Sequence, residues 1–134
     1  MRKFIIIILI IVGFLAFWLK KNPIWRFGYS RPGLIVYSAI PFPKVDLKIY
    51  SNGYFSTTKI KNHRLSKDDI EDVIREEPEF LIIGNGYKGE VKVSDEVFGC
   101  GAKVEVLLTP KAIKRFNELK DKGKTVAAII HSIH

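Results

Sequence analysis

Cysteine is almost absent from this sequence: Cys100 is the only one in 134 residues, which excludes an internal disulfide. No second cysteine and no histidine lies beside it, so a metal or catalytic centre built on Cys100 is not expected. The sequence also lacks a basic stripe interleaved with aromatic residues, and beyond residue 21 it has 18 basic against 14 acidic residues. This modest excess argues against nucleic acid as a partner. No cofactor is predicted.

Charged residues are also absent from Phe4 to Leu19, a run of 16 residues that is apolar throughout. As a helix this run would be about 24 Å long, slightly shorter than a hydrocarbon core of ~30 Å. Flanking lysines and Trp18 suit the membrane interface. A cleaved signal peptide is the alternative, but residues 15–19 lack the small residues that precede a cleavage site. Residues 1–21 are therefore predicted to form a single-pass transmembrane anchor.

The basic residues around this anchor bear on its orientation. Four of them follow the span within residues 20–31, whereas Arg2 and Lys3 precede it. Because cytoplasmic flanks carry the excess of lysine and arginine, the domain is predicted to face the cytoplasm from the cell membrane. The lipid bilayer is thus the first predicted partner. Residues 22–32, with proline, glycine and serine, are interpreted as an exposed linker.

The next segment predicts antiparallel strands. Leu34–Tyr37 is the first, and we expect Ile40–Pro43 to end it, because each proline lacks an N–H donor. Residues 45–50 alternate apolar and polar side chains, as a half-buried strand does. Asn52-Gly53 then predicts a hairpin turn into a partner strand at 54–60.

The chain is centred on residues 79–86, Glu-Phe-Leu-Ile-Ile-Gly-Asn-Gly. Four consecutive apolar residues, Phe80–Ile83, indicate a strand covered on both faces. A helix capped by Ser66 is predicted before it and must end at Pro78.

Two further strands are predicted at 103–108 and 125–130, with a helix at 110–122 between them that begins at Thr109-Pro110 and ends at Gly123. Strands that alternate with helices are typical of parallel crossovers, so these two strands and strand 80–84 should lie side by side. Residues 33–134 are therefore predicted to form a single α/β domain.

One candidate site follows from this topology. In open α/β sheets, ligands bind beyond the carboxyl ends of the strands, where Gly84-Asn85-Gly86 and Thr109 would lie. Backbone N–H groups in such a turn and at a helix N-terminus can bind an anion. Asn117, two turns along the helix, is a candidate buried hydrogen-bonding residue. The alternative is structural: the glycines form a turn, Thr109 caps the helix and Asn117 braces a loop.

The three histidines do not predict a catalytic or metal site. His63 precedes the Ser66 cap and is interpreted as a loop side chain rather than a catalytic base. His131 and His134 have the spacing of a ligand pair, but the sequence supplies no third ligand, so no metal site is predicted. No Ser/His/Asp set or pair of carboxylates accompanies them, and an enzyme is not supported.

The order of four segments, 78–86, 109–112, 116–119 and 123–128, resembles a conserved-domain family that includes mitochondrial complex I assembly factor 3 and the adipogenesis-associated human protein, besides archaeal and bacterial members. The resemblance covers roughly residues 33–131. It implies a three-layer α/β/α fold with a central mixed sheet and no established catalytic activity. The Gly-Thr-Gly turn of the family is Gly84-Asn85-Gly86 here, and the hydrophobic start lies outside the family domain.

Three functions are consistent with these features, in descending order. The first is a membrane-anchored, non-catalytic interaction module that assists the assembly of a membrane complex through a protein partner. The second is a domain that binds a small anion or metabolite at residues 84–86 and 109–110. The third is an enzyme that depends on Cys100, His131 or His134.

Overall fold

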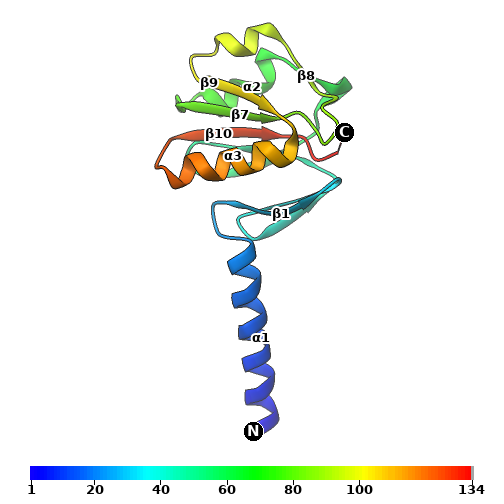
Figure 1. Cartoon of the computed structure of the whole chain (residues 1–134), viewed down its shortest axis with the longest axis vertical. Helices are drawn as coiled ribbons and strands as arrows, with labels where there is room; N and C mark the ends of the chain where they lie inside the picture. Colours follow the sequence, from blue (N-terminus) through cyan, green and yellow to red (C-terminus); the bar gives the residue numbers. More distant parts are fainter. Residues whose placement is uncertain (134) are drawn as a thin grey trace.

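The computed structural model describes residues 1–133, and its first element is the α-helix α1, Arg2–Lys21, which projects from one end of the molecule (Figure 1). None of its 20 residues is buried. The helix is long and apolar enough to cross a membrane by length and composition. The expected N-terminal apolar helix is therefore present.

A three-stranded antiparallel sheet follows directly, in the order β1-β2-β3. Its strands are β1, Phe27–Arg31, β2, Leu34–Tyr37, and β3, Ile40–Pro43. Two expectations are wrong here. The second half of the expected linker is strand β1, in which Phe27 is buried. Residues 40–43 continue the sheet because their prolines lie on its edge strand, where a missing N–H is tolerated.

The central sheet is mixed and has five strands in the order β5-β4-β10-β7-β9. Strand β7 runs parallel to both of its neighbours, β10 and β9, as the helical crossovers predict. Strand β4 is antiparallel to β10 and forms the expected hairpin with β5, in which Gly53 has a φ of +92°. The five strands are β4, Asp46–Ile49; β5, Phe55–Thr58; β7, Phe80–Gly84; β9, Lys103–Leu107; and β10, Val126–Ile130.

The helices lie on opposite faces of this sheet. Helix α3, Thr109–Asp121, packs on β7 and β10 from one side, and α2, Lys67–Ile74, contacts β10 from the other. Ser66 is the N-cap of α2, as expected, and it forms a capping box with Asp69, whose Oδ2 accepts the Ser66 N–H at 2.7 Å. The remaining elements are short: the 3-10 helices η1, Lys61–His63, and η2, Asp95–Gly99, and the paired strands β6, Arg64–Leu65, and β8, Lys92–Val93.

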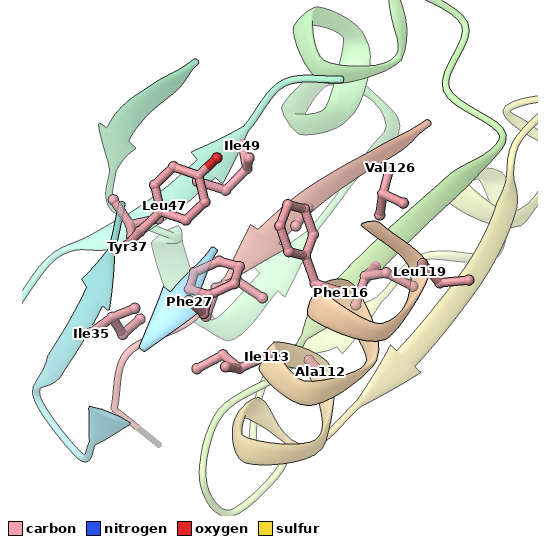
Figure 2. Packing of buried hydrophobic residues seen from close by; sticks show 13 residues of the cluster. Phe27, Ile35, Tyr37, Leu47, Ile49, Ala112, Ile113, Phe116, Leu119 and Val126 are labelled. Carbon is pink, nitrogen blue, oxygen red and sulfur yellow. The ribbon is translucent and has the colours of Figure 1, made fainter. Parts of the chain in front are cut away.

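The core has two parts because both faces of the sheet are covered. Ile82 and Ala128 face α3 and the small sheet, whereas Leu81 and Ala127 face α2 and η2. On the α3 side, Figure 2 shows Phe116 and its helix directed toward Phe27 and Tyr37 of the small sheet. Phe27 lies edge-on to the other two rings, with centroids 5.0 Å apart in each pair. These contacts make the small sheet part of the domain rather than a loose extension.

Candidate functional site

The glycine turn after β7 is shaped by close packing. A Cβ atom on Gly84 would lie 3.2 Å from the Thr109 Oγ1 and 3.3 Å from the Cβ of Ala112, so a larger residue would push these neighbours away by a few tenths of an ångström. Gly86 has a φ of +105°, which favours glycine. Geometry therefore explains both glycines.

The N–H groups of the turn already have acceptors inside the protein. The N–H of Asn85 donates to the Leu107 carbonyl oxygen at 2.9 Å, and the N–H of Tyr87 donates to the Ile133 carbonyl oxygen at 2.8 Å. The N–H of Gly86 donates to Thr109 Oγ1 at 3.0 Å. None of these three donors is available to an anion while these bonds persist.

Thr109 is completely buried and ties three segments together. Its hydroxyl accepts the Gly86 N–H and donates to the His131 carbonyl oxygen at 2.7 Å. The expected N-cap role is wrong, because Thr109 is the first residue of α3, Leu108 holds the cap position, and no side chain caps the helix. The hydroxyl instead links the glycine turn to the end of β10.

Gly84 at the end of β7 and Gly86 and Gly89 in the loop after it have Gly-x-Gly-x-x-Gly spacing, a pattern absent from the expectations above. In dinucleotide-binding proteins this pattern opens a helix whose N-terminus meets the pyrophosphate. Here the next element after β7 is strand β8. The structural context that would give the pattern its phosphate-binding meaning is missing.

Asn117 lies away from the turn, two turns along α3. Its Oδ1 accepts the Phe27 N–H at 3.0 Å, and its Nδ2 donates to the Phe27 carbonyl oxygen at 2.9 Å. This pair of bonds fixes strand β1 to the helix, which corresponds to the bracing alternative. The structure thus brings Thr109 to residues 84–86 but does not bring Asn117 there.

A polar cluster that the sequence does not predict lies at the same end of the sheet, beside the carboxyl ends of β7 and β10. Asp46, at the start of β4, is buried with its Oδ1 2.9 Å from His131 Nδ1. The same oxygen accepts the Ser132 N–H at 2.9 Å, and Oδ2 accepts the Ile60 N–H at 2.9 Å. The antiparallel pairing of β4 with β10 brings these residues together.

These contacts determine the charge state of Asp46. Burial would raise its pKa, but the hydrogen bonds from His131, Ile60 and Ser132 outweigh burial and the pKa is lowered. The alternation of apolar and polar residues at 45–50 predicts a half-buried strand, with Asp46 on the polar, solvent-facing side. In the structure Asp46 is buried instead.

Two hydroxyls lie near the Asp46–His131 pair, and both are directed at groups other than the imidazole. Ser132 Oγ donates to Asp46 Oδ1 at 3.4 Å. The nearby Thr109 hydroxyl is directed at the His131 main chain, and the His131 ring meets the His63 ring edge-on at 5.8 Å between centroids. Within the same residues, no group of three or more His, Cys, Asp or Glu side chains could hold a metal ion. His134, the second expected member of the histidine pair, lies outside the described residues.

Cys100 lies at the opposite end of the sheet, where the parallel strands begin. It precedes β9 and, with Pro78 before β7, lines a cavity of about 320 Å³ at the amino ends of these parallel strands. His131 follows β10 at its carboxyl end. The structure therefore does not bring Cys100 and His131 together, and a thiol–imidazole centre built on them is excluded.

A second cavity, of about 460 Å³, lies over the β6–β8 pair. It is lined by Arg64, Lys92 and Asp95 together with Ser66 and Ser94. Its charged side chains are exposed and of both signs. It contains no buried ionisable group of the kind that marks a reactive centre.

Residues 28–131 match the family model described as "Protein of unknown function (DUF498/DUF598)". The chain belongs to this family. The match begins inside β1, so α1 precedes the DUF498 domain and the domain includes the whole central sheet.

Solved structures agree with this assignment. MT938 is 28% identical to this chain, with a TM-score of 0.69, and the match covers 81% of this chain and 98% of that one. The conserved hypothetical protein PH1505 from Pyrococcus horikoshii OT3 is 25% identical over 81% of this chain and 99% of its own, with a TM-score of 0.72. An outer membrane protein from Bartonella henselae shares the fold at 16% identity, with a TM-score of 0.68 and coverage of 85% and 98%. The mixed α/β fold of the DUF498 domain is thereby established.

Proposed function

We propose that this chain is a membrane-anchored, non-catalytic interaction module, in which α1 spans the cell membrane and the DUF498 domain meets a protein partner on the cytoplasmic side. The observation that carries the proposal is the exposure of α1. Its large apolar side chains between Phe4 and Phe17 are 43–73% exposed. A lipid environment is the setting in which such a surface is stable.

The energetics of insertion favour this arrangement. Thirteen of residues 4–19 are Leu, Ile, Phe or Val. At about 0.3–0.6 kcal/mol each, they favour insertion by about 4–8 kcal/mol in total. Basic residues at both ends, Arg2 and Lys3 before the run and Lys20 and Lys21 after it, suit the headgroup regions.

Substitutions in α1 test the anchor. The double change Leu9→Arg and Val12→Arg places two charges in the middle of the helix at a cost of about 5–7 kcal/mol, which offsets the insertion energy. We expect this variant to leave the membrane fraction. Leu108→Arg, on the exposed surface of the domain, is the matched control and should remain there. A double variant that fractionates like the native chain would refute the anchor.

Two observations support an interaction role. One is the environment of the Asp46–His131 pair, and the other is the resemblance to a family that includes a complex I assembly factor. The pair is buried, and the two neighbouring hydroxyls donate to Asp46 and to the His131 carbonyl oxygen rather than to the imidazole. In residues 1–133 no group of three or more His, Cys, Asp or Glu side chains could hold a metal ion. Affinity capture from gently solubilised native membranes should recover a protein partner in stoichiometric amount. The Leu9→Arg, Val12→Arg chain should not recover it. Repeated capture of the native chain alone would contradict the role.

Anion binding at residues 84–86 and 109–110 is not carried into this proposal, because the turn donates its N–H groups to Leu107, Thr109 and Ile133. An enzyme that combines the Cys100 thiol with the His131 imidazole is set aside because these residues lie at opposite ends of the parallel strands. The Bartonella protein described as an outer membrane protein supports a shared fold and no more at its level of identity.

A further inference from the structure

The junction between α1 and the domain is a rigid contact rather than a tether. Asn22, directly after the helix, is 2% exposed. Its N–H and its Nδ2 donate to the Trp18 carbonyl oxygen at 2.8 and 3.2 Å, and its Oδ1 accepts the Tyr29 N–H at 2.7 Å. A Cβ on Gly28 would clash with Asn22 Oδ1 and lie 2.8 Å from the Asn22 Cα, so a larger residue at this position would shift the junction. The domain is thus held at the very end of the helix.

A hairpin of the small sheet lies beside the last turns of α1. The Trp18 indole N–H donates to the Ala39 carbonyl oxygen at 3.0 Å. Ala39 and Ser38 form the turn between β2 and β3, with φ values of +66° and +52°. Such turns usually contain Asn or Asp with Gly, whereas this one presents a methyl group and a single hydroxyl. The tip of the hairpin is therefore uncharged at the level of Trp18.

Apolar and aromatic side chains surround this junction. They are Ile24, Trp25, Ile40 and Tyr54, between 44% and 64% exposed, and we call them the collar. Trp25 donates its main-chain N–H to Ser38 Oγ at 3.0 Å, and its ring meets that of Tyr54 with centroids 6.0 Å apart. Ile40 directly follows Ala39. These contacts place the collar beside the point where α1 leaves the domain.

The length of α1 indicates what covers the collar. Its apolar run of about 24 Å is about 6 Å shorter than a typical hydrocarbon core. With no linker between the helix and the domain, a helix that spans the bilayer must draw the adjoining face of the domain into the headgroup layer. Trp and Tyr are the residues enriched in that layer. Lys20 and Lys21, both exposed beside the collar, suit anionic headgroups.

We infer that the collar of Ile24, Trp25, Ile40 and Tyr54 lies in the interfacial layer of the bilayer, so that the domain rests on the membrane in one fixed orientation. The inference rests on the proposed membrane anchor. It goes further, since an anchored domain could equally stand clear of the lipid. It also implies that the face carrying η2, at the end of the molecule away from α1, is the one open to the cytoplasm (Figure 1).

Tryptophan fluorescence tests the inference on the full chain, because Trp18 and Trp25 are its only tryptophans. Trp18→Phe leaves Trp25 as the reporter of the collar, and Trp25→Phe leaves Trp18 as the reporter of the anchor. Phe98→Trp in a chain that lacks both places a matched reporter on η2, far from α1. Each chain is reconstituted into phosphatidylcholine–phosphatidylglycerol vesicles, with and without lipid brominated near the headgroup, and its fold is checked by circular dichroism.

We expect brominated lipid to reduce the emission of the Trp25 and Trp18 reporters and to leave that of the Phe98→Trp reporter unchanged. Quenching of Trp18 without quenching of Trp25 would overturn the collar while leaving the anchor intact. Failure to quench Trp18 would overturn the anchor itself. A Trp25 that resists both brominated lipid and aqueous acrylamide would show that a second copy or another protein covers the collar, and would also overturn the inference.

Discussion

Replacing Thr109 with valine removes the hydroxyl that joins the glycine turn to the end of β10 while keeping the shape of the side chain. Thr109 is fully buried, so neither the Gly86 N–H nor the His131 carbonyl oxygen gains water in exchange. Each buried polar group left without a partner costs about 1–3 kcal/mol. Two such groups lower the free energy of unfolding by at least about 2 kcal/mol.

Thr109→Ser is the matched variant, because it retains both hydrogen bonds and loses one methyl group, worth about 0.8 kcal/mol. Thr57→Val, on an exposed position of β5, should change the free energy of unfolding by less than about 0.5 kcal/mol. Urea unfolding of the full chain in detergent, followed by near-ultraviolet circular dichroism, measures all three. For a domain of this size, 2 kcal/mol corresponds to about 8–16 °C in Tm. A Thr109→Val chain as stable as Thr109→Ser would refute the structural role assigned to the hydroxyl.

Three other perturbations follow from the site. Asp46→Asn should lower the free energy of unfolding at neutral pH by about 1–3 kcal/mol. Because the folded-state pKa of Asp46 is lowered, its contribution is present above the unfolded pKa of about 3.9 and is lost as pH falls through the folded value. The two chains should therefore converge in acid titrations, and a constant difference would contradict this. Asn117→Ala should cost about 1–3 kcal/mol by freeing the Phe27 main chain, measured by urea unfolding; an unchanged midpoint would contradict the brace. Phosphate and simple carboxylates should leave Tm unchanged in a thermal-shift screen, and a rise abolished by Gly84→Val would restore the anion hypothesis.

Much of the central sheet could be predicted from the sequence because its signals are strong and local. Phe80–Ile83 has no polar alternation and is covered on both faces of the sheet. The Asn52-Gly53 pair lies in the predicted hairpin turn between β4 and β5. Pro78 and Gly123 stand where the flanking helices must stop, although α2 ends earlier, at Ile74. These features depend on residues close in sequence.

The small sheet could not be predicted because tertiary contacts override its composition. Residues 22–32 contain the proline, glycine and serine of a linker, yet Phe27 fills the gap between Tyr37 and Phe116 and its main chain is held by Asn117. Prolines in residues 40–43 indicate a break only when the strand needs every N–H, and an edge strand does not.

The candidate site was predicted in part. Chain topology correctly brought Thr109 to the glycine turn, since both follow parallel strands of one sheet. Sequence could not indicate that the hydroxyl would face Gly86 and His131 instead of capping its own helix. Asp46 and His131 are 85 positions apart, and only the antiparallel pairing of β4 with β10 brings them into contact.

Alkaline carbonate extraction of membranes that contain the native full-length chain tests the central claim most directly. Carbonate strips proteins bound by charge or by other proteins and leaves those held by a helix in the hydrocarbon. An α1 that spans the bilayer predicts that the chain stays in the membrane pellet and floats with lipid on a density gradient. Recovery of the intact chain in the carbonate supernatant would contradict the anchor and, with it, the placement of the collar.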